Sequence, residues 1–112
     1  MSSATVRIDA DHISDWPTFH AVFADAFGFP LFYGKNMDAW IDCLTSLDDR
    51  AAGMTTVHVD SGRTLALIID NAGGFKRRCP EQFEALVNCA AFVNWRRIET
   101  GESAVLALAF CG

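Results

Sequence analysis

Residues 32–45 read FYGKNMDAWIDCLT, an aromatic loop followed by the start of an amphipathic helix. The loop closes on Gly34, and the helix begins near Asn36. Because residues three and four apart are neighbours on a helix, Asp38, Asp42 and Thr45 share one face. The apolar residues recur at the same spacing on another face, which predicts that this face is buried: Met37, Trp40, Ile41, Leu44 and Leu47.

Strand and helix patterns alternate on both sides of this segment. Strands are predicted around Val6, at Leu65–Ile69 and at Val105–Phe110, and helices near Trp16–Phe27, Asn36–Leu47 and Pro80–Ala90. Three adjacent apolar residues at 67–69 predict a central strand that is buried on both faces. Such alternation implies an α/β fold with a parallel sheet and right-handed crossovers. The length of 112 residues fits a single domain over 1–112.

Three stretches leave alternatives open. Thr55–Val59 is predicted to be an added strand that forms a hairpin with the central strand. Hairpin turns near Ser61 and Gly101 would then widen the sheet. Asn71–Arg78 is either a loop or a short helix. Phe92 lies off the apolar stripe of the last helix, so either that helix ends before Phe92 or the ring is exposed.

The composition excludes several classes of protein. Hydrophobic residues make up 51% of the chain and charged residues 21%, which indicates a packed core. The apolar runs are far shorter than the roughly 20 residues that cross a bilayer. The first residues lack the pattern of a signal peptide, so we expect a cytoplasmic protein. The net charge of −5 counts against direct nucleic-acid binding.

Little in the sequence points to catalysis. The four cysteines match no zinc or redox spacing, so we expect free, reduced thiols at Cys43, Cys79, Cys89 and Cys111. Cys79 follows a basic run at 76–78 and comes closest to the setting of a catalytic thiol. The three histidines are not at metal-site or catalytic-dyad spacings. We therefore expect no enzyme activity, no metal and no cofactor.

Asp38 and Asp42 form an acidic pair on the predicted helix. Two carboxylates at i and i+4 repel each other, and the helix dipole near the N-terminus offsets part of that cost. One interpretation is a solvated acidic face, and the other is a site for a basic partner. Residues 1–60 hold nine acids and three bases, a net charge of −6, which would steer a basic partner toward this half.

The whole run at 32–45 resembles the barstar family, the intracellular inhibitors of barnase-type ribonucleases. Nine positions agree with the family run: Tyr33, Gly34, Asn36, Asp38, Ala39, Asp42, Cys43, Leu44 and Thr45. The order of strands and helices is also similar over nearly the whole chain. The resemblance implies a three-stranded sheet with strand order 1-2-3, flanked by helices.

In that family the loop and the helix plug the nuclease active site. The resemblance therefore assigns nuclease contacts to Phe32, Asp38, Asp42 and Thr45, and a further acid on the later helix aligns with Glu81, with Glu84 as the alternative. Carboxylates on a rigid helix imitate phosphate oxygens and bind the cations that hold RNA. The implied partner is a basic extracellular or toxin-type ribonuclease, and we expect a monomer when the protein is free.

Several positions depart from the family pattern and keep other functions open. Phe32 replaces a tyrosine, Ile41 replaces a tryptophan, and Ser46 replaces a glycine. The basic run at 76–78 has no counterpart in the family pattern. The alternative function is a protein-interaction or regulatory module without a nuclease target. An enzyme that uses a histidine together with the acidic pair is a weaker third alternative.

Overall fold

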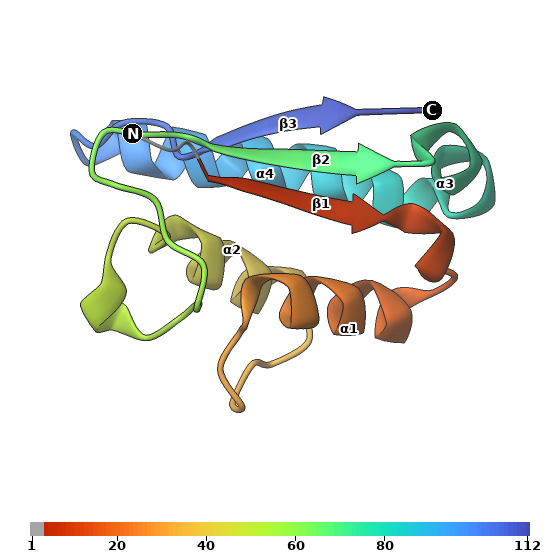
Figure 1. The fold of residues 1–112 in the computed structure, drawn as a ribbon, viewed down its shortest axis with the longest axis horizontal. Coiled ribbons are helices and arrows are strands. Elements are labelled where there is room, and N and C mark those ends of the chain that lie inside the picture. Colours follow the sequence, from red (N-terminus) through yellow and green to blue (C-terminus); the bar gives the residue numbers. More distant parts are fainter. Residues whose placement is uncertain (1–3) are drawn as a thin grey trace.

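A three-stranded parallel sheet forms the centre of the protein (Figure 1). The computed structural model describes residues 4–112. The strands are β1 (Thr5–Asp9), β2 (Leu65–Asp70) and β3 (Leu106–Phe110), in the order β1-β2-β3. Val6 is in register with Leu67, and Leu67 with Leu108. The predicted α/β class, the parallel sheet and the strand order are therefore confirmed.

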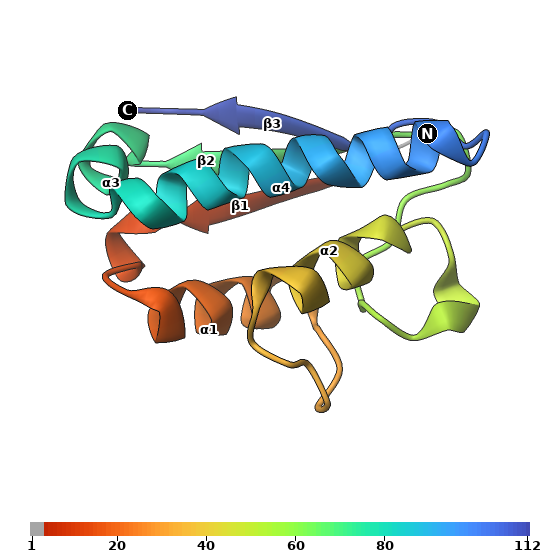
Figure 2. The ribbon, with the colours of Figure 1, turned by 180° about the vertical axis from the view of Figure 1, so that it is seen from behind.

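Four α-helices connect the strands and cover one face of the sheet. They are α1 (Trp16–Phe27), α2 (Met37–Thr45), α3 (Ala72–Arg78) and α4 (Pro80–Glu99). Short 3-10 turns follow β1 at Ala10–His12 and precede β2 at Arg50–Ala52. Helix α4 lies behind the strands in Figure 1 and in front of them in Figure 2, with α1 and α2 along its side. Between Asn71 and Arg78 the structure has the short helix, not the loop.

The central strand is buried on one face only, so the prediction of two buried faces is wrong. Leu65, Leu67 and Ile69 are fully buried, whereas Ala66 and Ile68 between them are half-exposed. The reason is that the helices pack on a single side of the sheet. The other side is open to solvent, and polar side chains of the flanking strand lie on it.

Helix α4 is nine residues longer than predicted, ending at Glu99 and not at Ala90. Its buried row continues through Val93 to Arg97, which is only 3% exposed. The prediction stopped at Ala90 because Phe92 lies off the buried row, and the arginine at a later buried position gave no apolar signal that the helix continues. Phe92 lies within the helix and is 44% exposed, which settles the alternatives in favour of an exposed ring.

The segment Thr55–Val59 is not a strand, and the described residues contain no hairpin that widens the sheet. Its backbone is used elsewhere: Thr56 N–H donates to the Phe27 carbonyl at 3.0 Å, and Val59 N–H donates to the Leu47 carbonyl at 3.1 Å. The segment therefore crosses the C-terminal ends of α1 and α2. Gly28 ends α1 in the left-handed conformation, with φ of 67°, and Thr56 packs where a Cβ would lie.

The core lies between the sheet and the helices and is rich in aromatic rings. Phe19, Phe23 and Phe27 form the buried row of α1. Trp40 of α2 is fully buried and meets Phe23 edge to face, with ring centroids 5.7 Å apart. This contact attaches α2 to α1 and sets which face of α2 is left for solvent.

Candidate protein-binding face

Helix α2 is held by its cap and by its buried side. The Asn36 side chain accepts a hydrogen bond from Ala39 N–H at 2.8 Å and so caps the first turn. The predicted stripe is buried at Trp40, Ile41 and Leu44, while Met37 at the first turn is half-buried. The opposite face is consequently fixed in position and free to meet another molecule.

Asp38 lies on that exposed face, in the first turn of α2. The positive end of the helix dipole favours a carboxylate there. The charge of Asp38 also acts on α4, where it adds to burial in raising the pKa of the Cys89 thiol. Helices α2 and α4 lie side by side along a seam (Figure 2).

Asp42 lies one turn further along and is paired with an arginine of its own chain. Its Oδ1 is 2.8 Å from Nη1 of Arg96 on α4, and the Asp42 side chain remains 56% exposed. Sequence reasoning missed Arg96 because the two residues are 54 positions apart and meet only through the packing of α2 on α4. The acidic pair is therefore exposed as predicted, but one of its carboxylates already has a cation.

Thr45 at the end of α2 turns its hydroxyl back to the helix. This hydroxyl donates to the Ile41 carbonyl at 2.6 Å, and the residue is half-buried. Its oxygen still has a lone pair with which it can accept one further bond. Thr45 shares the face of Asp38 and Asp42 by helical spacing, at the margin of the exposed surface.

Arg97 of α4 holds the C-terminal end of α2 in place. Its guanidinium donates to the Thr45 carbonyl at 2.7 Å, to the Ser103 carbonyl at 2.8 Å and to both carboxylate oxygens of Asp48 at 2.7 and 3.0 Å. Hydrogen bonding from this guanidinium keeps the pKa of Asp48 below its usual value. The sequence offered no signal for this network, since a basic residue near a helix end is more often solvated.

Phe32 projects from the loop before α2 and is 76% exposed. Its neighbour Tyr33 is buried instead and anchors the loop in the protein. A small cavity between the loop and α2 is lined by both of these rings together with Gly34, Ala39 and Asp42. The structure therefore brings Phe32 and Asp42 to the same hollow.

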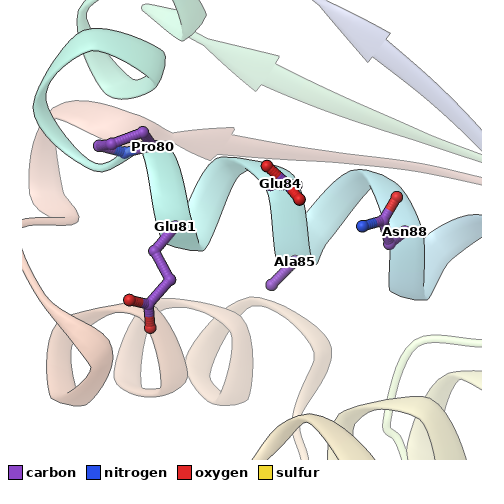
Figure 3. Close-up of a pocket in the computed structure, with 5 residues that line it drawn as sticks. All are labelled: Pro80, Glu81, Glu84, Ala85 and Asn88. Carbon is purple, nitrogen blue, oxygen red and sulfur yellow. The ribbon is translucent and has the colours of Figure 1, made fainter.

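Glu81 lies at the first turn of α4, over α1. Its Oε2 accepts a hydrogen bond from the Trp16 indole Nε1 at 2.7 Å. Figure 3 shows Glu81 pointing toward α1, along a shallow groove on α4, whereas Glu84 points away from α1. Trp16 in turn lines a second hollow with Asn36 and Met37, so this indole links Glu81 to the N-terminal end of α2.

Two of the remaining candidates for chemistry, Cys79 and His20, are buried, whereas Cys111 is exposed. Cys79 is 3% exposed and its thiol lies 3.7 Å from the Ile13 carbonyl, and the four cysteines are free. His20 is buried against Tyr33. In the part of the chain that the structure describes, no cluster of potential ligands could hold a metal ion. No helix among residues 4–112 is long and apolar enough to cross a membrane.

The comparison with known protein families agrees with this geometry. The family of barstar, the barnase inhibitor, matches residues 3–107. No curated protein sequence matches the chain. Because the match takes in β1, β2, the four α-helices and the loop before α2, the chain belongs to the barstar family.

Proposed function

We propose that this protein inhibits a barnase-type ribonuclease by closing its active site with α2 and the loop before it. The observation that carries the proposal is the exposed pair of Asp38 and Asp42 on a rigid helix, beside the exposed ring of Phe32. Membership of the barstar family also supports it.

The inhibition rests on imitation of RNA. A ribonuclease binds phosphate with cationic side chains, and the two carboxylates offer oxygens of the same charge on successive turns of α2. Each would form charge-assisted hydrogen bonds to those cations. Because α2 is capped and packed, little conformational freedom is lost when the contact forms.

Phe32 supplies the apolar part of the contact. The ring stands clear of the protein next to the hollow that it shares with Asp42. It covers an apolar surface or a ring of the enzyme beside the cationic site. The position has no hydroxyl, so it adds area and stacking without a hydrogen bond.

Thr45 and Glu81 are assigned smaller roles. Thr45 lies at the margin of the face, where its hydroxyl oxygen can accept one bond from the enzyme. Glu81 is oriented by the Trp16 indole and adds negative charge next to α1. Its main effect is on the electrostatic attraction of a basic enzyme.

The partner that this surface fits is a basic secreted or toxin-type ribonuclease, met in the cytoplasm of the cell that needs protection from it. The alternative function, a protein-interaction module without a nuclease target, has one observation in its favour. The Arg96 cation already occupies Asp42, which a module for another kind of partner would tolerate.

The test is a titration of purified barnase-type ribonucleases against the protein, with RNA cleavage as the readout. We expect stoichiometric loss of cleavage with at least one enzyme, and weak inhibition by Asp42→Asn. Asp70→Asn is the matched control, because Asp70 is also an arginine-paired aspartate but lies on the open face of the sheet. Full cleavage with every enzyme at micromolar inhibitor would refute inhibition and leave the interaction module.

A further inference from the structure

The exposed face of α2 that carries Asp38 and Asp42, here called the acidic face, has a cation of the same chain beside it. This cation, Arg96, occupies the position at which a partner's cation would bind Asp42. Nη1 of Arg96 lies 2.8 Å from Oδ1 of Asp42, and both side chains are about half exposed, at 46% and 56%. Among the described residues, Asp38 has no ion-pair partner. The two carboxylates of the face are thus unequal, one open and one occupied.

Arg96 stands on the side of α4 that faces α2. Cys89 and Arg96 are seven residues apart, which is two turns and therefore the same side of the helix. Cys89 lies near Asp38, and Arg96 binds Asp42, so the α4 side chains follow the acidic pair along the seam. The positive charge of Arg96 accordingly falls within the face that a nuclease would cover.

A carboxylate has two oxygens, and a bidentate partner cation needs both. While Arg96 holds Oδ1, a second cation at Asp42 meets a like charge at close range. On the basis of the proposed function, we infer that Arg96 is a specificity-determining residue that competes with the partner's cation for Asp42. Arg96 therefore weakens the binding of basic nucleases in general. Nucleases whose cation displaces Arg96 from Asp42 still bind.

Arg96 is able to leave Asp42, and its neighbour is not. An exposed ion pair is weak, because both charges are well solvated when apart. Arg97, the next residue, is 3% exposed and fixed by hydrogen bonds to two carbonyls and to Asp48. The two adjacent arginines therefore divide the roles: Arg97 holds α2 in place, and Arg96 is a movable group on its surface.

The experiment compares Arg96→Gln with the wild-type protein against a purified barnase-type ribonuclease, by stopped-flow association and by inhibition titration. Arg96→Gln is expected to lower Kd by up to about fivefold, because the competing charge has gone and the exposed pair that the partner must displace is weak. Arg7→Gln is the matched control: Arg7 pairs with Asp70 at 2.8 Å and is 58% exposed, so the charge change is equal. The control is expected to change Kd by less than about twofold, since it lies on the open face of the sheet.

The same substitution in an Asp42→Asn background separates competition from simple repulsion. If Arg96 acts by occupying Asp42, most of the gain in affinity disappears once the carboxylate is an amide. If Arg96 only repels the basic enzyme at a distance, the gain is the same in both backgrounds, and the inference is overturned. Urea unfolding of each variant verifies that it is folded.

The outcomes distinguish this inference from the proposed function. If wild type inhibits and Arg96→Gln behaves like Arg7→Gln, or binds more weakly, the inference fails and the function stands. If the wild-type protein binds no enzyme of the panel but Arg96→Gln does, competition by Arg96 is supported, whereas inhibition of those enzymes by the wild-type protein is refuted. If neither binds any of them, both fall.

Discussion

The hydroxyl of Tyr33 meets Nδ1 of His20 inside the protein, and this contact anchors the loop that exposes Phe32. Both residues are less than 10% exposed. Trp16 stacks on the imidazole, with ring centroids 5.7 Å apart. Burial lowers the pKa of His20 and raises the pKa of Tyr33, so both groups are neutral in the folded protein near pH 7.

Stability is expected to fall as the pH drops below about 6.5, the ordinary pKa of histidine. Below this pH the unfolded chain takes up a proton on His20, while folded His20, with its lowered pKa, does not. Proton uptake therefore favours the unfolded state, and the stabilisation is fully present only above pH 6.5. Urea unfolding between about pH 7.5 and pH 5 measures the slope. His20→Gln should flatten the slope in this range, and an unchanged slope would contradict the assignment to His20.

Arg97→Met is expected to destabilise the protein by about 3 kcal/mol, because it leaves Asp48 and two carbonyls without their donor. Arg96→Met, one residue earlier on the same helix, should cost at most about 1 kcal/mol, since its ion pair is exposed. Urea unfolding of the two variants at neutral pH gives both values. Equal losses would show that the buried network around Arg97 does not hold α2.

Alanine substitutions on the acidic face are expected to weaken nuclease binding in the order Asp42, Asp38, Glu81. Asp42→Ala should cost about 3 kcal/mol, because its loss strands buried cations on the enzyme. Glu81→Ala should cost least, since this residue lies over α1 and is bonded to Trp16. Isothermal titration gives the affinities. A loss at Glu81 greater than that at Asp42 would move the centre of the contact from α2 to the start of α4.

Phe32→Ala is expected to weaken nuclease binding by about 1–2 kcal/mol and to leave folding stability within about 0.5 kcal/mol of wild type. The ring is 76% exposed, so its removal opens no cavity in the protein. Phe92→Ala offers a comparison on α4, where the ring is 44% exposed and lies outside the loop. Inhibition titrations and thermal unfolding on the same samples separate the two effects. Should Phe32→Ala inhibit as well as wild type, the loop would have no part in the contact.

Local patterns were enough to predict most of the elements, because spacing along the chain is set by the geometry of a helix or strand. The stripe from Trp40 to Leu44 and the strand Leu65–Ile69 are examples. The end of α4 was missed because Phe92 lies off the buried row and because a later core position holds Arg97, which only its partners around Asp48 make tolerable. Thr55–Val59 has the composition of a strand but bonds to the ends of two helices.

In the candidate site, too, some features follow from local spacing and others depend on how distant helices pack. That Asp38 and Asp42 share an exposed face follows from their spacing alone. That Arg96 meets Asp42, and that Glu81 meets Trp16, depends on how α4 packs against α2 and α1. Contacts between residues more than 50 positions apart leave no trace in local periodicity, and a single sequence does not reveal them.

The contacts that hold α2 in place lie away from the residues that it presents. Trp40 is buried in the core, and Arg97 binds the last turn through a backbone carbonyl that any residue at position 45 would supply. Substitutions at Asp38, Asp42 or Arg96 therefore leave the fold almost untouched. Such a surface is free to evolve: a lineage can follow a changing enzyme, or acquire a new target, through a few exposed codons while the scaffold stays the same.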